Sequence, residues 1–284
     1  MIRLILFLLL WLTWSVAYAM EDADLAKRFP SESSYLQELL VAAQMECDGA
    51  LESLVNGTQK KWLRPPKQER WHLTETRELG DVEKIYALME KMGFFHEIST
   101  EKSHFDYAVI LGAAFPRVKN RMNFLIDLWK RGIRFRELVF LTGERPLDPE
   151  IEPQTIFIHT QALPQNEAEM MIYVYQHLEV PGEMRQLPLK VVSVPFDKIS
   201  GKRPARGDTI RGWLEGSPDL EKCLFVSNQP YCTYDTLVIR NHFPKNFSFE
   251  VVGSAADHLD VNTNILLDNL ARCLYEELQL KRNR

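Results

Sequence analysis

Polar side chains follow the apolar runs of this sequence, and they are the residues that could do chemistry. The clearest case is CLFVSNQPY (residues 223–231), in which Ser227, Asn228 and Gln229 come directly after four apolar residues. Hydroxyl and amide groups in this position can hydrogen-bond a ligand, or they can serve as ordinary loop and capping groups. Their concentration after several apolar runs favours a ligand site. Its other predicted members, all small or hydroxyl-bearing, are Gly112, Thr142, Gly143 and Thr209.

Arginines gather in the same segments of the chain. Guanidinium groups bind oxyanions bidentately, so these arginines favour a ligand that carries phosphate, sulfate or carboxylate. The alternative is that several of them pair with carboxylates of the chain, such as Glu144 and Glu167. We expect the first three of the set to hold the anion. The set is Arg117, Arg121, Arg145, Arg203 and Arg206.

Glu144 and Glu167 are the carboxylates that we predict for acid–base catalysis, since each follows an apolar run or opens a helical pattern. The signatures GxSxG, HExxH, GxxxxGK[ST] and GxGxxG do not occur. The seven histidines lack metal-ligand spacing, and we predict no metal site. The sequence is compatible with an enzyme and with a binding protein, and it indicates no particular cofactor.

Alternating patterns after residue 106 predict the elements that position these side chains. Apolar runs without internal alternation are typical of parallel strands covered on both faces, and their alternation with helices is typical of βαβ units. We predict an α/β fold with a doubly wound, mainly parallel Rossmann-like sheet, whose ligands bind outside the carboxyl ends of the strands. The predicted strands are 107–114, 137–143, 189–196, 223–228 and 249–254, and the predicted helices are 118–131, 166–178, 208–214, 233–242 and 263–280.

The pattern of apolar and polar residues is different in residues 20–100, and it predicts a helical N-terminal extension. Apolar spacing indicates helices at 34–49 and 81–92, the second with Asp81 as its N-cap. The turn signals Asn56-Gly57 and Pro65-Pro66 predict an irregular stretch between them. The tryptophans of this stretch belong either to a helical brace or to a lid over a site. They are Trp62 and Trp71.

The first residues, MIRLILFLLLWLTWSVAYAM, have the pattern of a secretory signal peptide. A basic residue precedes a short apolar run, and Ala17-Tyr18-Ala19 offers a cleavage site before Met20. An uncleaved anchor is the alternative, but the run is short for a membrane span. We therefore predict a signal peptide at 1–19, an extension at 20–100 and a Rossmann-like domain at 101–284, in a periplasmic or secreted protein without a stable membrane span after cleavage.

The net charge limits the classes of partner, and the cysteine positions limit the possible disulfides. The formal net charge of −5 does not suggest nucleic acid, which calls for a basic surface. The four cysteines form no CxxC pair, and Cys223 and Cys232 would lie at opposite ends of one strand, too far apart to bond. Cys47 and Cys273 could form a disulfide or remain buried thiols. The expected partner is an anionic small molecule.

Five segments, taken in order, resemble the YdcF/SanA/ElyC-like group of bacterial α/β proteins. They are DYAVILGAAFPRVKNRMNFLIDLW, VFLTGE, NEAEMM, GDT and LFVSNQPY, and the resemblance covers roughly residues 106–280. The group's pattern has a strand ending in LG, an arginine in the next helix, a strand ending in TGG or SGG, helices beginning with sEA and NT, and a strand ending in VTS. The resemblance implies a Rossmann-like domain and, for exported or anchored members, a role in the cell envelope.

The chain also departs from the group's pattern. Glu144 replaces the second glycine, Asp208 the asparagine and Ser227 the threonine, and the histidine and arginine that follow the VTS strand are absent. These departures indicate a divergent branch with its own ligand. One branch is reported to bind S-adenosylmethionine, a cofactor that an exported protein would rarely meet, and it is not carried over. The matching positions are Gly112, Arg121, Thr142, Gly143, Glu167 and Thr209.

Three functional hypotheses remain open on this reading. The first is an exported protein that binds, and hydrolyses or transfers, a phosphate- or carboxylate-bearing small molecule of the envelope-precursor class. The second is a non-catalytic binding or envelope-maintenance protein on the same scaffold, which the missing histidine and arginine favour. The third is a secreted factor that acts on a host or a neighbouring cell.

Overall fold

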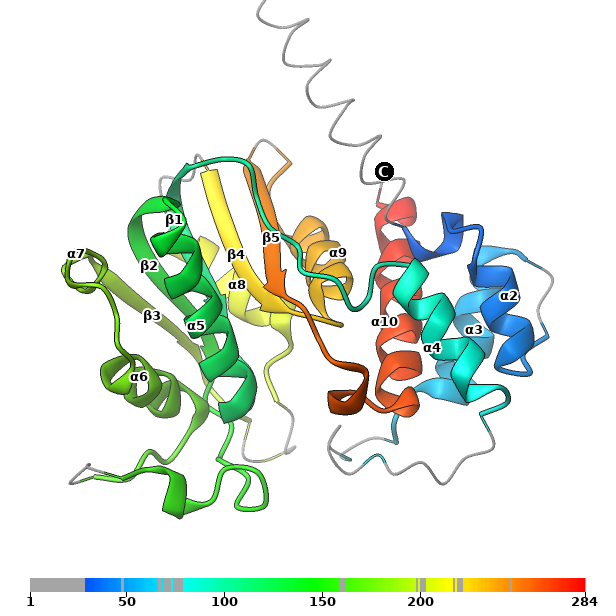
Figure 1. Ribbon diagram of the computed structural model, residues 1–284, viewed down its shortest axis with the longest axis horizontal. Coiled ribbons are helices and arrows are strands. Elements are labelled where there is room, and N and C mark those ends of the chain that lie inside the picture. Colours follow the sequence, from blue (N-terminus) through cyan, green and yellow to red (C-terminus); the bar gives the residue numbers. More distant parts are fainter. Residues whose placement is uncertain are drawn as a thin grey trace, which may run out of the picture. The chain divides into compact units, whose positions relative to one another are not determined.

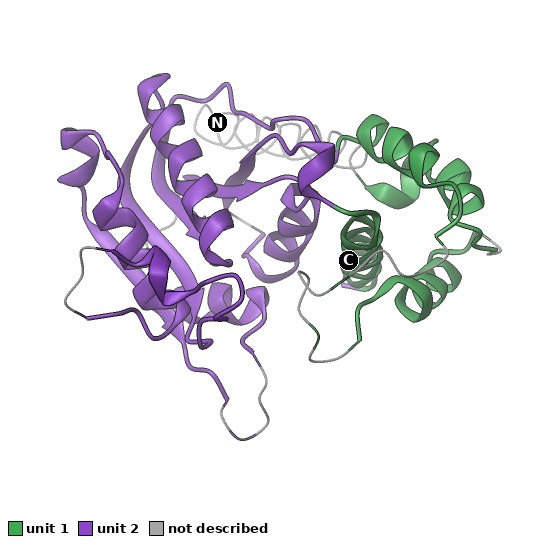
Figure 2. Cartoon of the chain, turned by 60° about the horizontal axis from the view of Figure 1, so that its bottom comes forward, with its two compact units in different colours: residues 1–93, 262–282 green, residues 94–261, 283–284 purple. Residues whose placement is uncertain are grey.

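The protein is represented by a computed structural model that describes most of the chain after residue 28. Its contacts divide the chain into two compact units, residues 1–93 with 262–282 and residues 94–261 with 283–284, which Figure 2 colours separately. The predicted signal peptide, Cys47 and Trp71 lie outside the described residues. The described residues are 29–46, 49–65, 68, 73, 79–158, 162–197, 199, 203–216, 218, 222–245 and 247–283.

The second unit contains a five-stranded, all-parallel sheet in the order β3-β2-β1-β4-β5. The predicted doubly wound, Rossmann-like fold is therefore confirmed. The strand order reverses between β1 and β4, and this is the switch point at which such sheets open a crevice beyond their carboxyl ends. The strands are β1 (His104–Leu111), β2 (Arg134–Gly143), β3 (Leu189–Val194), β4 (Lys222–Asn228) and β5 (Ser248–Ser254).

Helices cover both faces of this sheet (Figure 1). Side chains alternate along a strand, so Ile110 faces one layer of helices and Val109 faces the other. The Ile110 side packs against α5 (Phe115–Lys130), α6 (Glu167–His177) and α7 (Gly182–Arg185). The Val109 side packs against α8 (Arg206–Glu215) and α9 (Cys232–His242). Both faces of the central strands are buried, which explains their unbroken apolar runs.

Local signals in the sequence set several helix ends. Gly132 follows α5 with φ +100°, the left-handed conformation that a glycine adopts at little cost. Asn166 caps α6, because its side chain accepts a hydrogen bond from the Glu169 amide. Asp81 caps α4 (Val82–Lys91) in the same way through the Lys84 amide, as predicted. The cap at Asn166 places Glu167 as the first helical residue beside the carboxyl edge of the sheet.

The first unit is helical, and one prediction about it is wrong. Asn56-Gly57, expected in an irregular stretch, lies inside a helix, because tertiary packing of the buried Leu54, Val55 and Thr58 side chains overrides the local turn signal. None of the described helices is both long and apolar enough to cross a bilayer. The remaining elements are η1 (Pro30–Glu32), α2 (Leu36–Ala42), α3 (Leu51–Trp62), α4 (Val82–Lys91), η3 (Gln154–Ile156), η4 (His258–Asp260) and α10 (Thr263–Arg282).

The division into units differs from the predicted boundary in its last helix. We expected residues 101–284 to form one domain, whereas the contacts group α10 with α3 and α4 of the first unit. The Gln59 amide donates to the Ala271 carbonyl at 2.8 Å, and the Arg64 backbone N–H donates to Asp268 at 3.1 Å. α10 therefore completes the core of the N-terminal helices.

Candidate functional site

Buried charged side chains gather where β1, β2 and β4 end and where α5, α6, α8 and α9 begin. The arrowheads of the strands in Figure 1 mark this carboxyl edge of the sheet. The side chains form two groups in the second unit. The Arg145 cluster consists of Thr142, Arg145, Glu152 and Glu167, and the Asp235 cluster consists of Arg121, Arg206, Ser227, Asn228 and Asp235.

In the Arg145 cluster, one guanidinium group holds two carboxylates. Arg145 Nε donates to Glu167 Oε2 at 2.6 Å, and its two Nη atoms donate to the two oxygens of Glu152 at 2.7 Å each. Thr142 Oγ1 donates to Glu167 Oε1 at 3.2 Å. Arg145 is 4% exposed and Glu152 is 2% exposed. Ion pairs at this depth are screened little by water, so the cluster is rigid and costly to break.

Burial shifts the protonation equilibrium of the Glu167 carboxyl group. Loss of solvation raises the pKa of Glu167, and this outweighs the opposing effects of Arg145 and Thr142. Burial lowers the pKa of Arg145, but its bonds to Glu152 and the charge of Glu167 raise that pKa by a larger amount. The net pKa is therefore raised, and Arg145 stays charged. A carboxyl group with a raised pKa beside a permanent cation is suited to proton transfer.

Gly112, directly after β1, joins the two clusters. A Cβ atom at this position would lie 2.1 Å from Glu167 Oε1 and 3.0 Å from the Leu141 carbonyl oxygen. The Gly112 carbonyl accepts from Arg121 Nη1 at 3.1 Å and from Arg206 Nη2 at 3.4 Å. The glycine is required here because the Glu167 carboxylate occupies the space of a side chain.

We expect Gly112→Ala to lower the free energy of unfolding by about 1–3 kcal/mol, the usual cost of forcing an extra carbon into a packed site. The methyl group would displace the Glu167 carboxylate from Arg145. Urea denaturation measures the change. Gly182→Ala is the matched control, because no atom lies within 4 Å of its added Cβ, and it is expected to change stability by less than about 0.5 kcal/mol. Equal effects of the two changes would contradict the close approach.

In the Asp235 cluster, two arginines share one carboxylate. Asp235 is fully buried, and its Oδ2 atom accepts from Ser227 Oγ at 2.5 Å. Arg206 forms an ion pair with Asp235 Oδ1, and Arg121 Nη2 lies 4.0 Å from Oδ2. The two guanidinium groups come from α5 and α8, on opposite faces of the sheet. Asp235 therefore ties both helix layers to the end of β4.

Arg121 is almost completely buried under the switch point. Its side chain is 1% exposed, and Nε donates to Asn228 Oδ1 at 2.9 Å while Nη1 donates to the Leu111 carbonyl at 2.6 Å. Burial and then the charge of Arg117 lower the pKa of Arg121 to about 10. The Arg117 guanidinium itself lies over the Tyr231 ring, 4.6 Å from its centroid. This contact crosses from the segment after β1 to the segment after β4.

The structure brings most of the predicted site residues together, but it changes the role of two. Arg121 and Arg145 are bonded inside the chain rather than directed outward, so the predicted alternative of internal pairing holds for Arg145 with Glu167. Arg117 is half-buried in the first turn of α5, beside the switch point. The predicted residues that meet in the two clusters or contact them directly are Gly112, Arg121, Thr142, Arg145, Glu167, Ser227 and Asn228.

The side chains of four predicted residues take no part in the charge pairs of the two clusters. Glu144 is exposed and accepts from Ser193 Oγ at 3.2 Å. The Thr209 hydroxyl donates to the Arg206 carbonyl within its own helix at 2.9 Å. The remaining two are Gln229, whose Nε2 donates to the His96 carbonyl at 2.8 Å, and Gly143, which packs against Pro204.

Sequence reasoning missed Glu152 and Asp235, two of the three carboxylates that hold the arginines of the clusters. Asp235 had a usable signal, because it lies in the first turn of the helix after SNQPY, where acidic side chains are favoured. Glu152 had none, since it lies in a polar loop with several acidic residues. Its partner, seven residues away, becomes apparent only when the loop folds back over Arg145.

The cysteines of this unit do not contribute reactive groups. Cys223 and Cys232 are free and buried, which agrees with the prediction that they do not pair. Burial raises the pKa of each thiol to about 12, so neither forms the thiolate that nucleophilic chemistry needs. The predicted Cys47–Cys273 alternatives stay predictions, because Cys47 lies outside the described residues.

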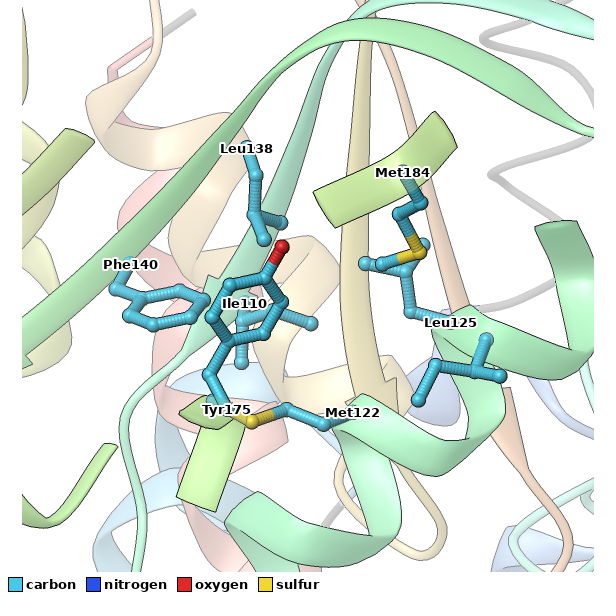
Figure 3. A pocket seen from close by; sticks show the side chains of 8 residues that line it. Ile110, Met122, Leu125, Leu138, Phe140, Tyr175 and Met184 are labelled. Carbon is cyan, nitrogen blue, oxygen red and sulfur yellow. The ribbon is translucent and has the colours of Figure 1, made fainter. Parts of the chain in front are cut away.

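An apolar gap lies in the layer between the sheet and α5, α6 and α7 (Figure 3). It is too narrow to hold a water molecule. We interpret it as imperfect packing rather than a ligand site. Its lining residues are Ile110, Met122, Leu125, Ile126, Leu138, Phe140, Tyr175 and Met184.

Comparisons with protein-family models, with curated proteins and with solved structures found no significant match. The resemblance to the YdcF/SanA/ElyC-like group therefore stays a prediction.

Proposed function

We propose that this chain is an exported α/β protein that binds a phosphate- or carboxylate-bearing small molecule at the carboxyl edge of its sheet. One observation carries the proposal: the buried Arg121 and the half-buried Arg206 share a single carboxylate, Asp235, at the switch point. Arg117 adds a third positive charge that lowers the pKa of Arg121. An anion placed beside these arginines, at the mouth of the crevice that such a switch point is expected to open, would relieve the repulsion between the guanidinium groups.

Two further features support an anionic ligand at this position. α5 and α9 begin just after β1 and β4, at the carboxyl edge of the sheet, and the positive ends of helix dipoles favour negative charge. The Arg117 guanidinium lies on the Tyr231 ring, at the same edge of the sheet as Arg121 and Arg206, and adds positive charge there.

Hydrolysis or transfer of the bound molecule is the activity that the neighbouring cluster supports. Gly112 separates the Glu167 carboxyl group from the arginines of the Asp235 cluster by a single peptide unit. Burial raises the pKa of Glu167, and a carboxyl group with a raised pKa is suited to general acid–base work. The tight pairing of Glu167 with Arg145 instead favours binding without turnover, as in the non-catalytic hypothesis. A turnover assay on each molecule that binds separates these two functions.

The proposal extends to location and family. The residues expected to form a signal peptide have the composition of a cleavable leader, which supports export. The chain would then be a divergent member of the YdcF/SanA/ElyC-like group, with a ligand of the envelope-precursor class. N-terminal sequencing of the exported protein is the test of the cleavage site before Met20.

The binding proposal is tested by thermal unfolding of the mature protein with phosphorylated sugars, nucleotides, prenyl phosphates and muropeptides. A ligand at 100 times its dissociation constant stabilises the native state by about 2.7 kcal/mol. We expect Arg117→Gln to weaken the affinity for the ligand, measured by this stabilisation, at least tenfold. Lys119→Gln, an exposed position of the same helix, makes the same charge change and is expected to leave the response intact. A full response from Arg117→Gln, or none from any compound, would refute the proposed site.

A further inference from the structure

The three arginines at the switch point approach it from different directions. Arg117 and Arg121 come from α5 on one face of the sheet, and Arg206 is the first residue of α8 on the other face. Arg206 reaches the end of β1, where its Nη2 atom lies 3.4 Å from the Gly112 carbonyl, and it also pairs with Asp235 of α9. Its side chain keeps 17% of its surface exposed. The mouth is therefore flanked by cations from both helix layers.

The shape of the ligand group follows from this arrangement. A carboxylate offers two oxygens in one plane, which suits a single guanidinium group. A phosphate monoester offers three oxygens pointing in three directions, which suits guanidinium groups that arrive from opposite faces of a sheet. A phosphate monoester also carries up to two negative charges. Arg121 and Arg206 share the single negative charge of Asp235, and Arg117 adds a third positive charge beside them.

We propose that the ligand group recognised at this mouth is the dianion of a phosphate monoester, held by Arg117 and Arg206 beside the buried Arg121. This inference rests on the proposed anion site and narrows its ligand class. A phosphodiester and a carboxylate are excluded as preferred ligands, because each carries one negative charge.

Small probe anions test the charge and shape of the site directly. Thermal unfolding of the mature protein is followed against methyl phosphate, dimethyl phosphate, sulfate and acetate, at constant ionic strength because salt screens such contacts. We expect saturable stabilisation by methyl phosphate and sulfate at pH 7.5, at least tenfold tighter than by the two monoanions. At pH 5, methyl phosphate should bind roughly tenfold more weakly, because its second pKa is about 6. Sulfate remains a dianion at both pH values and should not change.

Variants separate specific binding from the general stabilising effect of sulfate and phosphate, which needs no site and does not saturate. Arg117→Gln should remove the saturable part alone. Arg206→Lys keeps the charge opposite Asp235 but loses the planar fork, and it should weaken methyl phosphate several-fold. Arg211→Lys, an exposed position of the same helix, is its matched control and should leave binding unchanged.

The outcomes distinguish this inference from the proposed function. Equal affinity for methyl phosphate, dimethyl phosphate and acetate, each weakened by Arg117→Gln, would overturn the dianion and leave the anion site standing. Binding of methyl phosphate that is unaffected by either Arg117→Gln or Arg206→Lys would overturn the inference as well. Absence of saturable binding by every probe and by every compound of the larger panel would refute both.

Discussion

Arg145→Met is expected to lower the free energy of unfolding by about 3–5 kcal/mol, the cost of removing one partner from a buried ion pair. Methionine keeps most of the side-chain volume but leaves Glu152 and Glu167 without their cation. Both carboxylates then remain in a region that excludes water, and their mutual repulsion adds to the loss. Equilibrium denaturation in urea measures the change in unfolding free energy.

The control for this prediction is Arg131→Met. Arg131 bonds Glu97 at 2.7 Å, the same distance that joins Arg145 to Glu152, but its side chain is 47% exposed. An exposed pair of this geometry is worth less than about 1 kcal/mol, because water solvates both charges when the pair breaks. Similar losses from the two variants would mean that the Arg145 cluster is hydrated, and its role as a rigid base of the site would have to be abandoned.

Asp235→Asn is expected to be comparably damaging, at about 3–5 kcal/mol. The change keeps the shape of the side chain and an acceptor for Ser227 Oγ, but it removes the negative charge that Arg121 and Arg206 share. The loss of the Asp235 charge should destabilise Arg121 most, because burial and the charge of Arg117 already lower its pKa to about 10. Denaturation in urea again reports the loss, and a circular dichroism spectrum checks that the sheet still forms.

Asp127→Asn on the outer face of α5 provides the matched comparison for Asp235. Asp127 is 57% exposed and lies 3.6 Å from Lys130, so its loss should cost less than about 1 kcal/mol.

The proposed anion site leads to a second prediction for Asp235→Asn. With the internal carboxylate neutralised, sulfate should stabilise this variant more strongly than it stabilises the unaltered protein. A weaker response to sulfate in Asp235→Asn would contradict the view that Asp235 and the ligand compensate the same arginines.

The sequence by itself determined the fold class and most of the elements. Parallel strands covered on both faces require unbroken apolar runs, so segments such as 223–228 could be recognised without knowing their neighbours. The stop at Gly132 and the cap at Asp81 were likewise predictable, because each depends on one residue and its own backbone. The gathering of Gly112, Thr142, Ser227 and Asn228 at one edge was also predictable, since parallel strands collect their carboxyl ends there.

Only the tertiary structure decided how the charges at that edge are paired. Arg121 and Asn228 are 107 residues apart, and no local pattern predicts that they bond. The same holds for Arg145. Its guanidinium group and its position after a strand suggested a ligand-facing residue, whereas the structure shows it bonded to Glu152 and Glu167. Burial is a property of the assembled fold, and it decides whether an arginine faces a ligand or a carboxylate of its own chain.

Tertiary packing also decided the two structural surprises. α3 continues through Asn56-Gly57, because one side of this helix is buried and the packing exceeds a local turn preference worth about 1 kcal/mol. α10 reads as the last helix of an α/β domain but packs with α3 and α4. Hydrophobic periodicity states that a helix has an apolar face, whereas the partner of that face depends on the three-dimensional arrangement of the rest of the chain.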